Sequence, residues 1–403
     1  MNKQRLIYVL TLVAGFSLSF SLSFYLTPAS AGLLNPAING AKEIPKSASG
    51  IVVNPSEPKD QICPTNGQKY TLTEKKVWES RLPIIAMIEN TLEARPQSGL
   101  SSADIIYEAV AEGGVTRFMA VFYCDVANAV KIGPVRSARM YFVNLAAEYN
   151  SPIYMHVGGG NCSAADPGGP CTTNKKALAI EELQKMKWRK AGGRDFDTTF
   201  DGGAPVFVRD YFRLGKDVKI ATEHTMVGDL VAAWREGDKR GLYTDIKTGK
   251  LWATGFVSWK FTDKFDDEKL TSANKISFEF WKGWPEFGVT WEYDSASGFY
   301  KRSGGGAPQV DLENKQQLVA KNIVIQFTKQ EGPLDEHKHL FYDVISNGKA
   351  TFFINGKTFD GTWKKASQTG RTIYSNAQGK EVQFAPGQIW VEILPLGNKL
   401  DIQ

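Results

Sequence analysis

The hydrophobic pattern of the chain begins with one long uncharged segment. Residues 6–26, LIYVLTLVAGFSLSFSLSFYL, carry no charge, and Lys3 and Arg5 precede them. A helix of this length spans the ~30 Å hydrocarbon core of a bilayer. Positive charges before the segment, with the next lysine only at Lys42, place the rest of the chain outside the cytoplasm. We therefore expect an exported protein whose residues 1–31 form a signal peptide or a membrane anchor.

The residues after the apolar segment leave both fates open. Ala29 and Ala31 form an A-x-A signal for cleavage after Ala31, whereas the apolar run is longer than the core of a usual signal peptide. We expect the body at the extracytoplasmic face of the cell membrane, or secreted if the segment is cleaved. Residues 32–75 are rich in Pro, Ser, Asn and Lys without a sustained period, which predicts a flexible tether.

The next region mixes short apolar runs with helical periodicity. Residues 83–89 predict a buried strand, and two apolar runs around Gly113 and Gly114 predict a tight hairpin, because both glycines tolerate the positive φ of such turns. The segment RSARMYFVNLAAEYN predicts a helix that starts near Ser137. Further on, SPIYMHV and PVFVRDYF predict strands and TNKKALAIEELQKMKW predicts a helix. Strands mixed with helices indicate an α/β domain over residues 76–240.

The last part of the chain has the pattern of strands alone. The runs ISFEFW, FGVTWEYD, NIVIQFT, HLFYDVI and KATFFING are short, aromatic and β-branched. Asn347-Gly348 and Asn355-Gly356 are each a strong hairpin signal. The expected fold class is α+β, with a mixed α/β amino-terminal domain followed by a β-rich carboxy-terminal domain over residues 251–398.

Composition excludes some classes of protein. The 403 residues are 42% hydrophobic and 23% charged, which fits a globular chain and neither a disordered one nor a coiled coil. A net charge of +5 slightly favours anionic partners. The sequence has no dense basic stripe and no nucleic-acid-binding motif, so we expect no nucleic-acid partner. It also has no phosphate loop and no metal-ligand spacing, and we expect neither a cofactor nor a metal.

The four cysteines fit an exported protein. They form an even set, and no two have the C-x-x-C spacing of zinc or redox sites. We favour a disulfide between Cys162 and Cys171, which bracket a loop rich in Gly and Pro, together with one between Cys63 and Cys124. Four free thiols in a reducing environment are the alternative.

The hairpin allows a prediction about side chains. A two-residue loop would pair Val110 with Arg117 and Glu108 with Met119, and alternation would then put Glu108, Glu112 and Arg117 on one face. The two glutamates are candidates for an acid/base pair. Their positions lie ~13 Å apart along a strand, beyond the ~5–9.5 Å between glycosidase carboxyls. The alternative is an ion-pair network with Arg117 that stabilises the sheet.

Two arginines lie where a helix is expected to begin. If Ser137 is the N-cap, Arg136 and Arg139 flank a helix amino terminus that already carries partial positive charge. Arginine there has the wrong sign for stability, and a broken local rule often marks a site. Two guanidinium groups beside free N–H groups would bind a phosphate or a carboxylate. The alternative is that each arginine pairs with a carboxylate of the protein, such as Glu108 or Glu112.

A few other polar residues are candidates. His156 ends an apolar strand just before three glycines, a position that suits general acid/base work or ligand contact. A structural histidine with both nitrogens bonded is the alternative. Asp210 and His224 add polar groups further along, but their spacing does not assemble a metal site. The aromatic residues of the β-rich domain are mainly core, with a carbohydrate platform as the alternative.

Several long motifs resemble a known family. The segments ARPQSGLSSADIIYEAVAEGGVTRFMAVF, IGPVRSAR, HVGGG, YKRSGGGAPQVD, KNIVIQF, GTWKK and PGQIWVEILP resemble the YerB-like lipoproteins, a two-domain bacterial family of unknown function. The resemblance covers about residues 80–395 and implies an envelope protein. Such lipoproteins carry a cysteine at the end of the signal, whereas the first cysteine here is Cys63. This departure favours an uncleaved helix as the anchor.

These features together predict an extracytoplasmic, membrane-tethered envelope protein that binds an anionic ligand. The expected partners are an anionic envelope polymer or an envelope protein, and the membrane through the amino-terminal segment. One alternative is a cell-wall glycan hydrolase or transferase, with Glu108 and Glu112 as acid and base and His156 as auxiliary; another is a scaffold that docks an envelope protein. The ligand-binding candidates are Arg95, Asp104, Arg117, Arg136, Ser137, Arg139 and Asp210.

Overall fold

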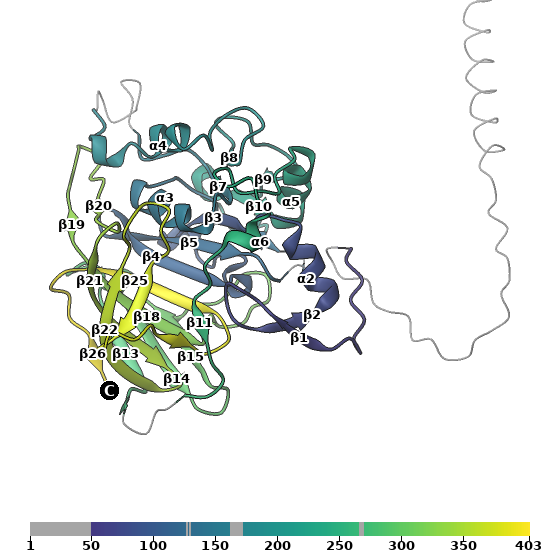
Figure 1. Ribbon diagram of the computed structural model, residues 1–403. Coiled ribbons are helices and arrows are strands. Elements are labelled where there is room, and N and C mark those ends of the chain that lie inside the picture. The colour runs from purple at the N-terminus through teal and green to yellow at the C-terminus, as the bar shows by residue number, and fades with distance from the viewer. Residues whose placement is uncertain (1–49, 126–127, 129, 162–171, 266–269) are drawn as a thin grey trace, which may run out of the picture. The chain divides into compact units, whose positions relative to one another are not determined.

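The computed structural model describes residues 50–125, 128, 130–161, 172–265 and 270–403 (Figure 1). The apolar segment 6–26 and the predicted Cys162–Cys171 disulfide lie outside these residues. Within the described ranges, no helix has the length and apolar character needed to cross a membrane. The described elements belong to one folded unit.

The first half of the chain mixes helices and strands. In chain order they are β1 (Lys59–Ile62), β2 (Lys69–Thr71), α2 (Leu72–Glu79), β3 (Ile84–Glu89), β4 (Ile105–Glu112), β5 (Val115–Phe122), β6 (Lys131–Ile132), α3 (Met140–Ala146), β7 (Ile153–His156), α4 (Ala179–Lys185), β8 (Asp195–Asp197), β9 (Phe207–Arg209), β10 (Met226–Asp229), α5 (Leu230–Lys239) and α6 (Trp252–Gly255). Short 3-10 turns lie at Leu92–Ala94, Leu100–Ser102, Ala147–Tyr149, Lys175–Ala177 and Thr222–His224.

The second half consists of strands and one 3-10 turn, Pro285–Phe287, among the residues that the structure describes. The strands are β11 (Lys260–Phe261), β12 (Thr271–Ser272), β13 (Lys275–Phe278), β14 (Val289–Asp294), β15 (Phe299–Gly304), β16 (Ala307–Pro308), β17 (Val319–Ala320), β18 (Asn322–Thr328), β19 (Gln330–Glu331), β20 (Phe341–Tyr342), β21 (Asn347–Ile354), β22 (Lys357–Lys364), β23 (Ile373–Asn376), β24 (Gln383–Phe384), β25 (Ile389–Pro395) and β26 (Asp401–Ile402). The α+β prediction is confirmed.

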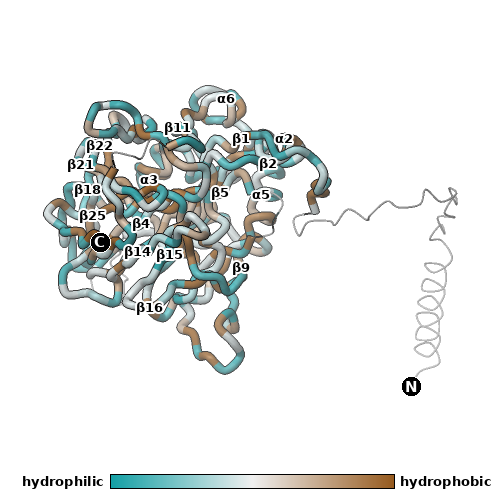
Figure 2. Tube along the Cα trace, turned by 90° about the horizontal axis from the view of Figure 1, so that it is seen from below, coloured by the Kyte–Doolittle hydropathy of each residue, from teal (hydrophilic) through white to brown (hydrophobic). Residues whose placement is uncertain are grey.

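The central sheet contains strands from both halves. Its order is β12-β22-β21-β18-β25-β4-β5-β3-β7-β8, with β23 beside β22 (Figure 1). The halves join where β25 pairs in parallel with β4, so that Glu392 lies opposite Glu108. A second sheet, β16-β15-β14-β13-β26 with β17 beside β15, belongs to the second half alone. Hydrophobic positions in Figure 2 lie mostly among the strands and hydrophilic ones along the outer loops, as expected when one core serves both halves.

The predicted tether is shorter than the sequence indicated. Residues 59–71 form the hairpin β1-β2, and α2 begins at Leu72, inside the range 32–75 that was expected to be flexible. A disulfide bond between Cys63 and Cys124, with 6.0 Å between the Cα atoms, attaches this hairpin to the end of β5. Thr71 and Glu74 form a capping box that starts the helix. A cross-link and a cap thus order a stretch that has little apolar periodicity.

The β4–β5 hairpin contains an irregularity that alternation did not predict. Glu112 pairs with Val115, but Val110 pairs with Thr116 and Glu108 with Phe118, so the register shifts at Ala111. Such a β-bulge inserts one residue into a strand and reverses which face the following side chains point to. The predicted pairs Val110–Arg117 and Glu108–Met119 are therefore wrong.

The helix after β6 starts later than expected. Its first residue is Met140, and Arg139 takes the N-cap position without a side-chain capping bond. Ser137 instead lies in an extended segment that bridges β3 and the end of β7, because Val135 pairs with Ile88 and Ala138 with Gly159. These tertiary hydrogen bonds outweigh the local capping preference of serine.

One of the two hairpin signals in the second half is correct. Asn355 and Gly356, with φ of 52° and 74°, form the turn between β21 and β22. Asn347-Gly348 is not a turn, because both residues belong to β21 and pair with residues of β22. A Cβ on Gly348 would lie 2.7 Å from the indole nitrogen of Trp363. The glycine is needed for this close approach rather than for a turn.

Candidate functional site

The carboxyl ends of several strands meet at one edge of the central sheet. Strands β3, β7 and β8 are parallel, and β4 runs the same way because both β3 and β4 are antiparallel to β5. In α/β sheets, ligands bind outside the carboxyl ends of the strands. Glu89, Glu112 and His156 occupy these ends. We call this place the carboxyl edge.

Glu112 is held by two arginines. Arg117 donates from Nη2 to Glu112 Oε1 at 3.1 Å, and Arg139 donates from Nε to Oε2 at 3.1 Å and also from Nη2. Burial raises the pKa of Glu112, but the two guanidinium groups outweigh it and bring the pKa to about 2. Arg139 is therefore engaged with a carboxylate of the protein, which was the alternative to ligand binding.

Arg117 has further capacity for hydrogen bonding. Its side chain is 3% exposed, and Nη1 donates to the Ser137 carbonyl at 3.3 Å. Its Nε is buried and has no hydrogen-bond partner. A buried donor without a partner costs stability unless a further group satisfies it.

Arg136 lies in the same extended segment and differs from its two neighbours at this edge in its side-chain contacts. Its backbone N–H donates to the Met87 carbonyl, which fixes it against the end of β3. The side chain is partly buried, its Nε has no partner, and it forms no ion pair among the described residues. Burial lowers the pKa of Arg136, and Arg117 acts in the same direction while Glu89 opposes it. Within the described part of the chain, Arg117 and Arg139 pair with Glu112, whereas the guanidinium of Arg136 forms no ion pair.

The remaining charged groups at this edge are paired. Glu89 accepts from His224 Nδ1 at 2.9 Å, and both side chains are buried. A backbone β-bridge joins His339, from the second half, to Glu112, and the His339 Nδ1 lies 2.8 Å from Asp335. Burial lowers the pKa of His339 despite this carboxylate. The second half thus closes one side of the carboxyl edge.

His156 is a structural residue. Its ring is fully buried, with Nδ1 2.7 Å from the Gly158 carbonyl and Nε2 2.5 Å from Asp195. Burial lowers the pKa of His156, but the hydrogen bond and charge of Asp195 raise it further, so the ring is protonated more readily than usual. Arg189 bridges Asp195 and Asp197 on the far side. With both nitrogens bonded, His156 has no free nitrogen for the predicted auxiliary role.

Glu108 and Glu112 do not form a pair. Paired residues of antiparallel strands point to the same face, so Glu108 shares a face with Phe118, and Glu112 shares the other with Arg117. Glu108 is fully buried and accepts from Thr116 at 2.6 Å and from Arg302 at 2.5 Å. The bulge places the two carboxylates on opposite faces of the sheet. They therefore cannot flank one glycosidic bond.

The face of Glu108 carries a buried network that sequence reasoning missed. Arg302 donates to Glu108 and, at 2.7 Å, to Glu392, and Trp291 donates to Glu392 at 2.9 Å. Burial raises the pKa of Glu392 well above its usual value; Arg302 opposes this and Glu108 adds to it. One arginine thus serves two buried carboxyls, and the raised pKa of Glu392 favours its protonated form. The network joins the two halves of the chain.

A second buried network lies at the end of α3. Glu148 accepts from Lys365 at 3.2 Å, from Thr372 Oγ1 at 2.6 Å and from Arg371. Burial raises the pKa of Glu148, but the two cations outweigh it and lower the pKa. This carboxylate also connects the first half to the second.

The other predicted ligand-binding residues have local partners. Arg95 donates to Asn90 Oδ1 and to the Glu286 carbonyl, both at 3.1 Å. Asp210 accepts from the backbone N–H of Phe212 at 2.9 Å and so shapes its own turn. The Ser137 side chain is partly buried beside Arg136. Of the predicted residues, the structure brings Arg117, Arg136, Ser137 and Arg139 together and leaves Arg95, Asp104 and Asp210 elsewhere.

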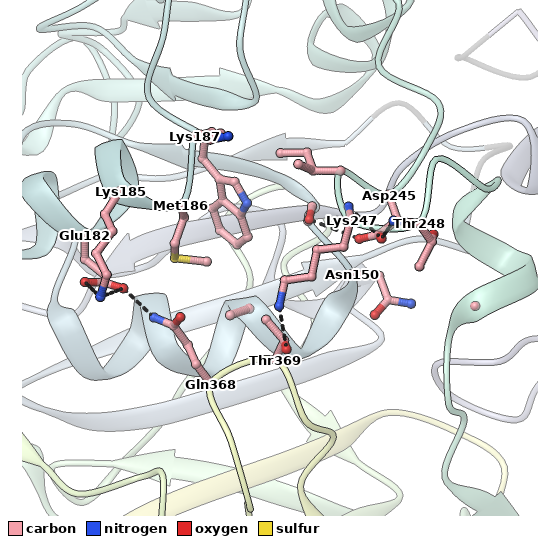
Figure 3. Close-up of a pocket in the computed structure, with 15 residues that line it drawn as sticks. Asn150, Glu182, Lys185, Met186, Lys187, Asp245, Lys247, Thr248, Gln368 and Thr369 are labelled. Carbon is pink, nitrogen blue, oxygen red and sulfur yellow. Dashed lines mark hydrogen bonds and ion pairs between the residues drawn. The ribbon is translucent and has the colours of Figure 1, made fainter.

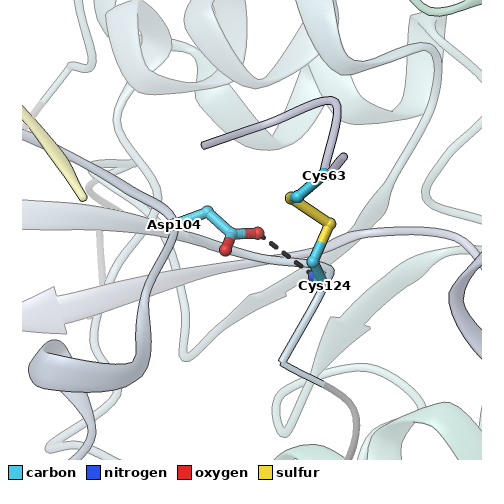
Figure 4. Close-up of side chains that lie close together, drawn as sticks. All are labelled: Cys63, Asp104 and Cys124. Carbon is cyan, nitrogen blue, oxygen red and sulfur yellow. Dashed lines mark hydrogen bonds between the residues drawn. A yellow bond between two sulfur atoms is a disulfide. The ribbon is translucent and has the colours of Figure 1, made fainter. Parts of the chain in front are cut away.

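Asp104 lies against the disulfide. It accepts from Thr65 Oγ1 at 2.8 Å and from the Cys124 N–H at 3.3 Å (Figure 4). Burial raises the pKa of Asp104 to about 7, although these hydrogen bonds lower it. Cys63, Asp104 and Cys124 have the proximity of a metal site, but both sulfurs are bonded to each other and are not available as thiolate ligands.

Comparisons with known proteins agree with this two-part organisation. The N-terminal domain of a protein of unknown function, DUF3048, matches residues 71–194, and the C-terminal domain of the same family matches residues 276–391. The chain belongs to the DUF3048 family. "Putative lipoprotein YerB" of Bacillus subtilis (strain 168) is 29% identical over 341 residues, which are 85% of this chain and 88% of YerB. A crystal structure of YerB from Bacillus subtilis matches with a TM-score of 0.63 and 25% identity, over 85% of this chain and 100% of that one.

Proposed function

We propose that the protein is a membrane-tethered, extracytoplasmic envelope protein that binds a carboxylate or phosphate of an anionic envelope polymer at Arg136. The uncharged segment 6–26 and the name of the relative YerB as a lipoprotein support attachment to the outer face of the membrane. Arg117 would lie beneath the bound anion and add a second positive charge. Ser137 and Arg139 would position these two groups rather than contact the ligand.

The observation that carries the proposal is the free guanidinium of Arg136 at the carboxyl edge. A partly buried arginine loses hydration, and a protein carboxylate usually compensates for that loss. Here Glu112 is occupied by Arg117 and Arg139, and Glu89 by His224. An incoming anion would complete the pairing, and the planar fork of arginine suits two-point binding of a carboxylate or phosphate.

The test is binding of the full chain to isolated envelope fractions at low and high salt. We expect Arg136→Ala to weaken binding about tenfold, since a two-point charged contact is worth more than a neutral one. Arg235→Ala, which removes an exposed arginine on α5, is the matched control and should bind like the wild type. Arg139 should not be replaced in this test, because its loss would leave Glu112 with one partner and disturb the fold.

Protease treatment of the envelope fraction distinguishes a polymer ligand from a protein ligand. Digestion of the envelope fraction with a protease removes protein partners and leaves the polymer in place. Binding that survives digestion and falls with salt and with Arg136→Ala supports the polymer. Binding that is lost on digestion assigns the site to an acidic envelope protein instead. Binding that ignores both salt and the substitution refutes the proposal.

A further inference from the structure

A cavity lies at the opposite end of β7 from the carboxyl edge. Its volume is about 520 Å³, within the range of small-molecule sites. Five separate segments line it: residues 147–151 before β7, residues 182–188 at the end of α4, residues 245–248, Gly255 at the end of α6, and residues 368–369 of the second half (Figure 3). The cavity therefore exists only when both halves of the chain are folded together.

Strained backbone is concentrated around this cavity. Asn150, Ser151 and Lys187 have φ of 49°, 61° and 61°, and all three line the cavity. They are half of the six non-glycine residues with positive φ in the described part of the chain. Such residues are uncommon, and when clustered they often mark a binding site.

Lys187 is the most informative of the three. Trp188 N–H donates to the Leu183 carbonyl and Lys187 N–H to the Gln184 carbonyl, which is the Schellman arrangement at the end of α4. In this motif the residue at the position of Lys187 is usually glycine, because the left-handed conformation disfavours a Cβ. A lysine there lowers the stability of the helix end. Its exposed side chain lies at the rim of the cavity.

The acidic groups around the cavity are already occupied. Glu182 accepts from Gln368 at 2.8 Å and lies 3.3 Å from Lys185. Asp245 is buried and accepts from the Ser151 hydroxyl and from backbone N–H groups of its own turn. Neither carboxylate is free to attract a cation.

Two ammonium groups at the cavity form no ion pair with a carboxylate of the described residues. Lys247 extends across the cavity and donates to the hydroxyl of Thr369 at 2.9 Å (Figure 3). Lys187 makes no ion pair with the residues that the structure describes. Beside them, Met186, Trp188 and Ile246 provide an apolar surface. A ligand with one negative charge and an apolar body complements this combination.

We propose that this cavity binds a small carboxylate with an apolar body, such as the last residue of a short peptide. The apolar body contacts Met186 and Ile246, the carboxylate binds the ammonium group of Lys247, and Lys187 adds a positive charge at the rim. The site goes beyond the proposed function, because it is at the other end of β7 and shares no residue with the carboxyl edge.

The first experiment compares two probes that differ in charge alone. N-acetyl-leucine carries the carboxylate and N-acetyl-leucinamide does not, and calorimetry or NMR titration of the full chain measures the binding of each. We expect the acid to bind and the amide to bind at least several-fold more weakly, with a difference that shrinks as salt is added. Hexanoate, measured beside them, distinguishes a fatty carboxylate from a peptide terminus.

Three variants test the residues. Lys247→Met keeps the apolar stem and removes the charge, and Lys187→Gly removes a charge while relieving the backbone; each should weaken N-acetyl-leucine binding about fivefold. Lys187→Gly should also raise the urea midpoint, so weaker binding is not a folding defect. Lys315→Gly is the control, because Lys315 has the same φ of 61° outside the cavity. It should raise the midpoint and leave binding unchanged.

The outcome separates this site from the carboxyl edge. Arg136→Ala should bind N-acetyl-leucine like the wild type, so failure of one proposal leaves the other standing. Equal binding of acid and amide, or no binding of either carboxylate, overturns the proposal. Binding that is unaffected by both Lys187→Gly and Lys247→Met does the same.

Discussion

The buried network of Arg302 makes a quantitative prediction about pH. Glu108 and Glu392 are both fully buried and both accept from Arg302, and burial raises the pKa of Glu392, which favours its protonated form. The Oε2 atom of Glu392 is buried and has no hydrogen-bond partner among the described residues. It faces Glu108, so a proton on this oxygen would donate to the Glu108 carboxylate. Glu392→Gln mimics the protonated form, because its amide donates to Glu108 in the same way.

The sign follows from proton linkage. A glutamate whose folded pKa is raised contributes stability that is fully present below its unfolded pKa of ~4.3 and is lost as the pH rises toward the folded pKa. The loss is ~1.4 kcal/mol per pH unit while the folded carboxyl stays protonated and the unfolded one ionises. Between pH 5 and pH 8 the wild type should therefore lose stability relative to Glu392→Gln, and the loss should level off once the pH exceeds the folded pKa of Glu392.

The assay is urea unfolding of the full chain at pH 5, 6, 7 and 8, followed by tryptophan fluorescence. Only the difference between wild type and variant is used, since all other titrating groups are common to both. Glu336→Gln, which changes an exposed glutamate, should follow the wild type at every pH. A difference between wild type and Glu392→Gln that stays constant with pH would mean that Glu392 is ionised in the fold, and would refute the reasoning.

Three other predictions concern the core. Replacing Cys63 and Cys124 by serine should lower the free energy of unfolding by about 4 kcal/mol, because the disulfide closes a long loop, and reductant should give the wild type the same urea midpoint. A carboxyl ¹³C titration should give Asp104 a pKa of about 7. The stability that protonated Asp104 contributes should be lost as the pH rises from the pKa of unfolded aspartate to pH 7. Gly348→Ala should cost roughly 2 kcal/mol by overpacking, whereas Gly203→Ala, with open space around it, should leave the melting temperature unchanged.

The sequence predicts strands and turns well where the local pattern decides them. The β4–β5 hairpin was found from Gly113 and Gly114, and the turn at Asn355 from its asparagine-glycine pair. The bulge was not predictable, because Ala111 is a small apolar residue inside an apolar run and breaks no visible pattern. That single residue decides whether Glu108 and Glu112 share a face, so the acid/base hypothesis depended on a detail that alternation does not contain.

The candidate site was predicted only in part, because its contacts depend on tertiary geometry that local patterns do not show. Arg136 and Arg139 were recognised because arginine is unfavourable at a helix amino terminus. That argument did not apply to Arg136, because the helix begins further along the chain. The helix starts at Met140, since segment 135–138 bonds to β3 and to the residues after β7. The partner of each arginine depends on the bulged hairpin. A sequence without that geometry leaves ligand binding and internal pairing equally open; the structure pairs Arg139 with Glu112, and ligand binding by Arg136 stays a prediction.

Residues far apart in the chain account for what the sequence could not supply. Arg302 and Glu392 reach Glu108 across the junction of β25 with β4, and His339 reaches Glu112 at the carboxyl edge. The cavity beside Lys187 is likewise completed by Thr369. No local sequence pattern indicates that such residues meet, because each of them lies in a separate strand or loop without an unusual sequence.

The junction also determines what the functional unit is. A first half without the second would expose the edge of β4 and remove Arg302, and Glu108 left buried without that arginine would cost several kcal/mol. It would also lose the residues that close the carboxyl edge and the cavity. The two family domains therefore form one folded body, and both contribute residues to the carboxyl edge and to the cavity. Any ligand that contacts both halves binds only to the complete fold, and its binding stabilises the junction.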